Sequence, residues 1–285
     1  MNDYYNPARK EMQMTHYHTV LTIAGSDSGG GAGIQADIKT ISALGCFATS
    51  AITAVTVQNT LGVQDIHPVP APIVEGQIRA VLDDIGADAV KIGMLQSEEI
   101  VLTIARTLRH YAVKHIVLDP VMVSTSGHRL IEENAMQALC QQLIPMARII
   151  TPNIPEAEWL LGGRKLSGQD SLPEAARELS ETFGVSVLLK AGHLEEDCLV
   201  DYFCDASHHD IIPLPSARIP TRNTHGTGCT MSSALAALLA KGLTLEEAAR
   251  GAKRFIEQAI RSGARYEIGH GHGPVNHFFS PLTPE

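Results

Sequence analysis

The stretch THGTGCTMSSALAALLAKG, at residues 224–242, joins a glycine-rich turn to a helical pattern. Gly226 and Gly228 flank Thr227. The apolar residues that follow recur at helical spacing, at Met231, Leu235, Leu238 and Leu239. Backbone N–H groups at a helix start lack partners and carry partial positive charge, so glycines there let an anion approach closely. The stretch predicts a phosphate site, although a tight turn before a buried helix explains the same pattern.

Cys229 follows this turn and would lie in the first turn of the helix. The field of a helix N-terminus lowers the pKa of a thiol, so a reactive thiolate is expected beside the phosphate site. The alternative is a small apolar residue that only fills space.

A possible cation site follows another predicted strand, in TPNIPEAEWLL. Asn153 and Glu156 have the spacing of a capping box, with Pro155 in the first turn. The same side chains could face a hydrated Mg²⁺, which needs only one or two protein carboxylates besides phosphates and water. Asp119 also ends an apolar strand, where it is either directed at a metal or a turn former before Pro120.

Three further polar residues are candidates for ligand contacts. Lys190 closes the apolar strand VSVLLK and could meet a phosphate oxygen or simply reach water. Gln58 ends another strand, and its amide offers the donor and acceptor that suit the edge of a heteroaromatic ring. Asp37 lies in the first turns of a predicted helix, where its negative charge interacts favourably with the helix dipole even if it contacts no ligand.

The elements that carry these residues alternate between strands and helices. The segment from Val20 to Ala24 predicts a strand, followed by the loop SDSGGGAGIQAD and a helix. This loop satisfies neither the GxGxxG pattern nor the P-loop pattern. Further strands are predicted at residues 49–57, in ADAVKIGML, KHIVLDPVM, ARIIT and VSVLLK, with helices between them, including residues 132–144 and 172–183, and a hairpin-like section at 198–214.

This alternation predicts a mostly parallel sheet covered by helices on both faces, in one domain at residues 18–285. Ligands bind at the carboxyl ends of the strands in such sheets, where the candidate residues would gather. Residues 1–17 are expected to form a flexible tail, and residues 121–129, VMVSTSGHR, suit a mobile flap.

Composition narrows the class of protein. Of 285 residues, 44% are hydrophobic, enough for a substantial core, and the net charge of −9 argues against nucleic acid as a partner. The sequence predicts neither a membrane helix nor a signal peptide. The five cysteines have no CxxC spacing, which favours reduced thiols in the cytoplasm. Histidine pairs such as His16 and His18 are interpreted as solvated loop residues rather than metal ligands.

Together these motifs resemble a known family. The segments TIAGSDSGGGAGIQADIKT, AVTVQNTLGV, VKIGML, VLDPVM, ITPNIPEAEWLL, LLKAGH and THGTGCT are similar to those of hydroxymethylpyrimidine and phosphomethylpyrimidine kinases of thiamine biosynthesis. The resemblance implies a ribokinase-like, three-layer α/β/α fold, usually a homodimer. The implied activity transfers the γ-phosphate of ATP first to a pyrimidine hydroxymethyl group and then to the resulting monophosphate.

The resemblance also implies roles for individual residues. The pyrimidine pocket would be lined by Gly25, Asp37, Gln58, Met94 and Val121. Lys190 and the turn from Thr224 to Cys229 would hold the ATP phosphates, with the backbone of Gly226, Thr227 and Gly228 stabilising the transferred charge. Asn153 and Glu156 would hold Mg²⁺ through water.

Two alternatives remain open from the sequence. Many ribokinase-like relatives carry an aspartate base where this chain has Cys229, whereas hydroxymethylpyrimidine kinases and some pyridoxal kinases share the cysteine. The stretch VQNT favours the pyrimidine kinase over pyridoxal kinase. A binding relative without catalysis is the other alternative, which the intact GTGC turn disfavours.

Overall fold

The computed structural model describes residues 15–122, 130–192, 194 and 196–279. Most of the expected tail, at residues 1–14, and most of the expected flap, at residues 123–129, lie outside these ranges.

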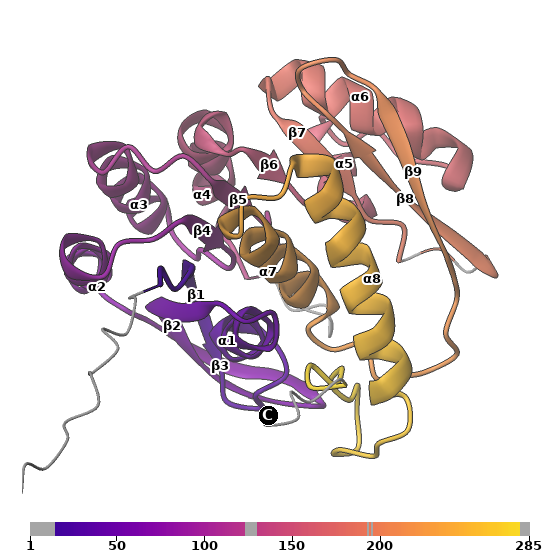
Figure 1. The fold of residues 1–285 in the computed structure, drawn as a ribbon, viewed down its shortest axis with the longest axis horizontal. Coiled ribbons are helices and arrows are strands. Elements are labelled where there is room, and N and C mark those ends of the chain that lie inside the picture. The colour runs from indigo at the N-terminus through magenta and orange to yellow at the C-terminus, as the bar shows by residue number, and fades with distance from the viewer. Residues whose placement is uncertain (1–14, 123–129, 193, 195, 280–285) are drawn as a thin grey trace, which may run out of the picture.

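One sheet runs through the described part of the chain (Figure 1). Its nine strands there have the order β3-β2-β1-β4-β5-β6-β7-β8-β9. The strands from β2 to β7 in this order are parallel, whereas β3, β8 and β9 pair antiparallel. The strands are β1 (Thr19–Asp27), β2 (Phe47–Asn59), β3 (Gly62–Pro68), β4 (Ala89–Ile92), β5 (Ile116–Leu118), β6 (Ile149–Ile150), β7 (Ser186–Leu189), β8 (Cys198–Cys204) and β9 (Ile211–Ala217).

Helices cover both faces of this sheet (Figure 1). On one face pack α1 (Gly33–Ala43), α7 (Thr227–Ala240) and α8 (Leu245–Gly263). On the other face pack α2 (Ala71–Asp84), α3 (Glu98–His110), α4 (Glu133–Ala138), α5 (Ile154–Leu160) and α6 (Leu172–Phe183). Side chains along a strand alternate between the two cores, so Leu21 and Ile23 face one and Val20 the other. The predicted three-layer fold with a mostly parallel sheet is confirmed.

The sequence pattern missed or misplaced some elements. Strand β3 was not predicted, because it is an edge strand with mostly polar, exposed side chains and a proline at its end. The helix predicted at residues 132–144 is shorter: α4 gives way to a π-helical turn, Leu139–Leu143, and a 3₁₀ turn, Ile144–Met146. Pro145 lacks the N–H that an α-helix would use there. The hairpin expected from residue 198 is present as β8 and β9.

In the described residues, no helix is long and apolar enough to cross a membrane.

A buried ion pair joins the sheet to two helices. Lys91 of β4 is fully buried, and its Nζ lies 2.8 Å from Oδ2 of Asp37 on α1. The Asp37 carboxylate also accepts hydrogen bonds from Thr22 of β1 at 2.6 Å and Ser233 of α7 at 2.7 Å. Burial alone would lower the pKa of Lys91, but the neighbouring Asp37, Cys229 and Asp119 outweigh burial and raise it. Both members of the pair are therefore satisfied within the core.

We expect Lys91→Met to lower the free energy of unfolding by about 3–5 kcal/mol, because it leaves the Asp37 carboxylate buried without its cation. Urea denaturation measures this change. The control Lys241→Met removes an exposed lysine that bonds only the Leu44 carbonyl, and it should change stability by at most about 0.5 kcal/mol. Equal losses in the two variants would contradict the assigned role of the pair.

Candidate active site

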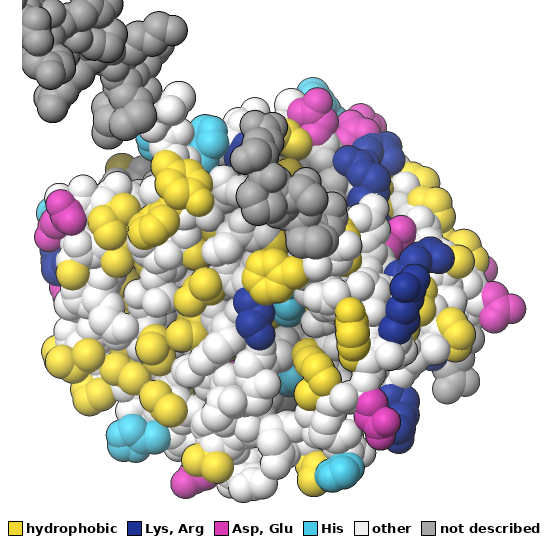
Figure 2. Space-filling model, turned by 60° about the horizontal axis from the view of Figure 1, so that its bottom comes forward, with side chains coloured by type: hydrophobic (Ala, Val, Ile, Leu, Met, Phe, Trp, Pro, Cys, Tyr) yellow, Lys and Arg dark blue, Asp and Glu magenta, His cyan; other side chains and the backbone are white. Residues whose placement is uncertain are grey.

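A large cavity lies at the carboxyl ends of the parallel strands. Its volume is about 1480 Å³, whereas pockets for a single small ligand usually measure roughly 300–1,000 Å³. Figure 2, with the bottom of Figure 1 turned forward, shows the surface hollowed near its centre, where basic and histidine side chains are visible. The cavity has room for two ligands side by side.

The start of α7 forms the floor of this cavity. Gly226 is the N-cap and is left-handed, with φ of 81°, and no side chain caps the helix or places a negative charge in its first turn. Among the described residues, the N–H groups of Gly228 and Cys229 have no hydrogen-bond partner in the protein. The predicted helix start is confirmed, and its geometry suits an anion.

The start of α1 lies against the start of α7. A Cβ on Gly226 would come 1.8 Å from the carbonyl oxygen of Gly31, so only glycine permits this approach. Helix α1 also lacks a side-chain cap at its N-cap Ala32. Two helix N-termini therefore face one region of the cavity, and their positive ends add.

Asp27 and His225 tie these two helix starts together. The Asp27 carboxylate accepts hydrogen bonds from the backbone N–H groups of Gly29, Gly31 and Ala32 and lies 2.8 Å from Nε2 of His225. Burial would raise the pKa of Asp27, but His225 and the N–H donors outweigh burial and lower it. Sequence reasoning included His225 only as part of the turn from Thr224 to Cys229 and gave Asp27 no role. An aspartate directly before a glycine-rich loop was an available signal, because such a side chain can bond the loop's N–H groups.

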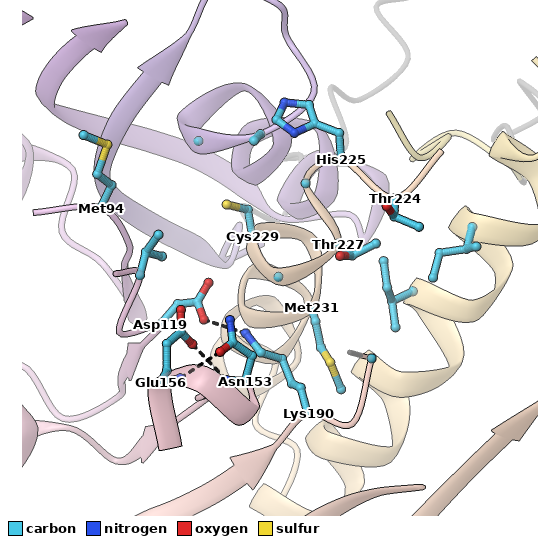
Figure 3. Close-up of a pocket in the computed structure, with 18 of the residues that line it drawn as sticks. Met94, Asp119, Asn153, Glu156, Lys190, Thr224, His225, Thr227, Cys229 and Met231 are labelled. Carbon is cyan, nitrogen blue, oxygen red and sulfur yellow. Dashed lines mark hydrogen bonds and ion pairs between the residues drawn. The ribbon is translucent and has the colours of Figure 1, made fainter. Parts of the chain in front are cut away.

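A lysine and two acidic residues converge beside the α7 turn (Figure 3). Oδ1 of Asp119 accepts hydrogen bonds from Lys190 at 2.8 Å and Thr151 at 2.9 Å, whereas among the described residues Oδ2 has only Ser232 at 3.5 Å. Burial would raise the pKa of Asp119, but Lys190 and Lys91 outweigh burial and lower it. Asp119 therefore keeps one nearly free, ionised oxygen toward the cavity.

Glu156 lies next to this group. The predicted capping box is present: Asn153 accepts from the Glu156 N–H at 2.9 Å, and Glu156 accepts from the Asn153 N–H at 2.8 Å. Burial raises the pKa of Glu156 to about 7, with a further contribution from Asp119. Such a carboxyl favours a cation nearby, because a cation stabilises its ionised form.

The expectation of a Cys229 thiolate is wrong for the protein without ligands. Burial raises the pKa of Cys229 to about 11, and Asp37 and Asp119 add to the rise. Lys91 and the Gly33 N–H act in the opposite direction but do not compensate. The desolvation of the thiol and the acidic neighbours outweigh the helix field on which the sequence argument relied.

One end of the cavity is lined by residues that the resemblance assigned to the pyrimidine pocket. Gly25, Gln58, Met94 and Val121 all line it. Asp37 does not, because it points into the core toward Lys91 and is fully buried. The expectation that Asp37 lines the pyrimidine pocket is therefore wrong. Its carboxylate lies in the core behind the cavity wall, where it pairs with Lys91.

The other end of the cavity lies between α8 and the β8–β9 hairpin. Lining residues here come from both elements and from the segment that leads to the α7 turn, and include Leu199, Arg218, Pro220, Lys253, Ile256 and Ile260. Sequence reasoning named none of them, because they meet only in the folded chain. Thr224 and Lys190 lie between this end and the α7 turn.

The fold and this cavity define a class of protein, the ribokinase-like kinases. The crystal structure of an ADP complex of Bacillus subtilis pyridoxal kinase superposes with a TM-score of 0.84 at 36% identity, covering 94% of this chain and 100% of that one. A Clostridium difficile phosphomethylpyrimidine kinase superposes with a TM-score of 0.74 at 43% identity, covering 85% and 99%. The sequence pattern of the phosphomethylpyrimidine kinase family matches residues 27–276, and the chain belongs to this family.

Similar sequences agree with this membership. The hydroxymethylpyrimidine/phosphomethylpyrimidine kinase of Rhizobium meliloti is 49% identical over 259 residues, 90% of this chain and 96% of that protein. A thiamine biosynthesis bifunctional protein of Geobacter sulfurreducens is 49% identical over 263 residues, which are 92% of this chain. The chain spans about half of that longer relative, 52% of its length.

We expect Gly226→Ala to weaken ATP binding by at least about tenfold, because the new Cβ would push the α7 turn away from Gly31. Titration calorimetry measures the affinity. Gly242→Ala is a matched control: Gly242 has φ of 84° against 81° for Gly226, but a Cβ there meets nothing within 4 Å. Both variants should lose about 1–2 kcal/mol of stability from backbone strain, so an equal fall in ATP affinity would show that strain alone matters.

Proposed function

We propose that this protein uses ATP to phosphorylate 4-amino-5-hydroxymethyl-2-methylpyrimidine and then its monophosphate, in thiamine biosynthesis. The observation that carries the proposal is the position of the unpaired N–H groups at Gly228 and Cys229, between an amide-lined end and a lysine-bearing end of one cavity. The activities of the family's named members support it.

The pyrimidine is placed at the end lined by Gln58, Met94 and Val121. The Gln58 carboxamide would bond the amino edge of the ring. Oε1 of Gln58 accepts from Thr56 at 3.1 Å, and its Nε2 lies 3.4 Å from His225, so its neighbours limit how the amide can turn. Met94 packs with Ala54 and Leu130 into an apolar wall suited to a ring face.

The phosphates of ATP are placed over the α7 turn. Lys190 has its pKa raised, since Asp119 and Glu156 outweigh the opposing effect of burial, and it stays charged for a phosphate oxygen. The γ-phosphate then lies between Lys190 and the hydroxyl of the pyrimidine. Phosphoryl transfer requires mainly in-line positioning and stabilisation of charge, and fixed N–H donors supply the latter without reorganisation.

The residues present fit a magnesium ion. Glu156, with its raised pKa, and the nearly free Oδ2 of Asp119 form an oxygen donor set beside the phosphate position. Mg²⁺ prefers such oxygens and retains several waters, so Glu156 and Asp119 would hold it with water between. Asn153 keeps Glu156 in place through the capping box. When bound, Mg²⁺ would supply positive charge that neutralises the phosphate oxygens during transfer.

The same site serves both transfers in this proposal. The monophosphate is already ionised and needs no base, whereas the alcohol must lose a proton. Cys229 places a sulfur that can accept a proton in the first turn of α7, where the γ-phosphate is placed, and its raised pKa of about 11 leaves little thiolate at neutral pH. The first transfer is therefore the one that depends on Cys229.

A second copy of the chain is proposed as partner, as the family resemblance implies. The β2–β3 edge exposes apolar side chains that suit such a contact, with Val55 48%, Val57 53% and Leu61 65% exposed. The molecular mass in solution, from light scattering, is the measurement that checks it.

Pyridoxal phosphorylation is a second candidate, favoured by the fold comparison with pyridoxal kinases. A coupled assay of ATP consumption on the pyrimidine alcohol, its monophosphate and pyridoxal tests the two. We expect turnover of both pyrimidines, with kcat/KM at least about tenfold above that for pyridoxal, since one well-matched hydrogen bond to Gln58 is worth roughly that factor. A preference for pyridoxal would overturn the proposal, and no turnover of any substrate would favour a binding protein.

Cys229→Ala is expected to slow transfer to the alcohol by about 10²–10⁴-fold and to affect transfer to the monophosphate much less. In the unmodified protein the first transfer should accelerate with pH by about tenfold per unit between about pH 7 and 9, because the thiolate fraction grows in that proportion below a pKa of about 11. Single-turnover rates for each step measure both effects. Equal losses in the two steps would exclude Cys229 as the base.

A further inference from the structure

A cluster of two histidines and an aspartate lies far from the active site. His16 and His18 precede β1, and Asp88 precedes β4, its neighbour in the sheet. These are the amino ends of the strands, whereas the cavity lies at the carboxyl ends. From Thr19 to Gly25 β1 rises about 20 Å, at roughly 3.3 Å per residue, so the cluster is independent of the kinase site.

Hydrogen bonds within the protein fix the position of Asp88 without a bound ligand. The backbone N–H of Asp88 bonds the Thr19 carbonyl at 2.9 Å, and Oδ2 of Asp88 accepts the Thr19 N–H at 2.8 Å. The His16 and His18 rings lie edge to face, 5.2 Å apart, while Tyr17 between them turns away onto Phe47. The two imidazoles thus meet the carboxylate from one side.

The donor atoms have the separations of a metal site. Nε2 of His16 lies 2.9 Å and 3.1 Å from the two Asp88 oxygens, and Nδ1 of His18 lies 3.9 Å from Oδ2. All three donors fall within 4.8 Å of one another. Ligands at about 2.0–2.1 Å from a tetrahedral zinc ion are roughly 3.3 Å apart, so small side-chain shifts would bring them into place.

An unsatisfied atom points to a ligand here. Nδ1 of His18 is shielded from solvent and has no hydrogen-bond partner in the described structure. Leaving a buried polar atom unpaired is unfavourable, and a bound metal ion would supply the missing partner.

We propose that His16, His18 and Asp88 bind a divalent transition-metal ion, Zn²⁺, with water as the remaining ligand. Two imidazoles and one carboxylate are typical zinc donors, and three protein ligands leave a position open. His16 is 64% exposed, which leaves space for the water. This differs from the sequence-based interpretation of His16 and His18 as solvated loop residues.

Neighbouring groups limit the site to these three ligands. Cys46 is buried and does not belong to this group of donors. Its Sγ contacts the Ala237 carbonyl at 3.6 Å. The bound ion would join the segment before β1 to the loop before β4, and so stabilise the folded chain in proportion to zinc concentration.

The test is a zinc titration of the full chain after removal of metals with a chelator, in competition with a chromophoric zinc indicator. We expect one zinc bound per chain at this site, and at least about tenfold weaker binding in His16→Ala and in Asp88→Asn. Asp88→Asn keeps an oxygen for the Thr19 N–H, so it removes the charge with little change in structure. His110→Ala, which removes an exposed histidine of α3, is the matched control and should bind zinc unchanged.

Thermal denaturation with and without zinc separates binding from folding. Zinc should raise the melting temperature of the unmodified chain and of His110→Ala, but not of His16→Ala or Asp88→Asn. Co²⁺ should show the intense visible bands of a four-coordinate ion only where zinc binds. Unchanged zinc affinity in His16→Ala and Asp88→Asn would overturn the proposal. A lower melting temperature in these variants without zinc, and no response to zinc in any chain, would show that the cluster is an ion pair alone.

Discussion

The active site depends on the close approach of two helix starts. Gly226 at the start of α7 contacts the Gly31 carbonyl at the start of α1. The contact is so close that a side chain on residue 226 would have no space. Unpaired N–H groups repel one another at such a junction, so an anion between them lowers the energy of the folded protein. The Asp27 carboxylate offsets part of this repulsion from the α1 side by accepting three N–H groups of the loop and pairing with His225.

The buried charged side chains around the site are also paired. The turn lies over Lys91 and Asp37, which neutralise each other in the core, and beside Lys190 and Asp119, which neutralise each other at the cavity wall. Two lysines therefore stay charged at buried positions, with Glu156 as the acidic group whose pKa is raised. A cation beside Glu156 and an anion on the turn would complete this balance.

The two ends of the sheet differ in what they offer. At the carboxyl ends, loops of several strands leave a cavity large enough for two ligands. At the amino ends, hydrogen bonds between Thr19 and Asp88 hold the carboxylate that the His16, His18 and Asp88 cluster shares. A metal there would act on the stability of the sheet and not on the chemistry at the other end.

Much was determined by the sequence alone. Alternating apolar runs predicted the strands and helices, and local signals placed the capping box at Asn153 and Glu156 and the helix start after Gly226, because caps and glycine turns act within a few residues. The family resemblance placed Gln58, Met94 and Lys190 at one cavity, which the structure shows they line.

Only the tertiary structure decided the properties that depend on distant neighbours. The pKa of Cys229 is raised by burial and by Asp37 and Asp119, far away in sequence, and these outweigh the local helix field. Asp37 faces Lys91 rather than a ligand, Asp27 pairs with His225 across 198 positions, and His16 meets Asp88 across 72. Pattern and propensity describe neighbours along the chain, whereas electrostatics and desolvation depend on neighbours in space.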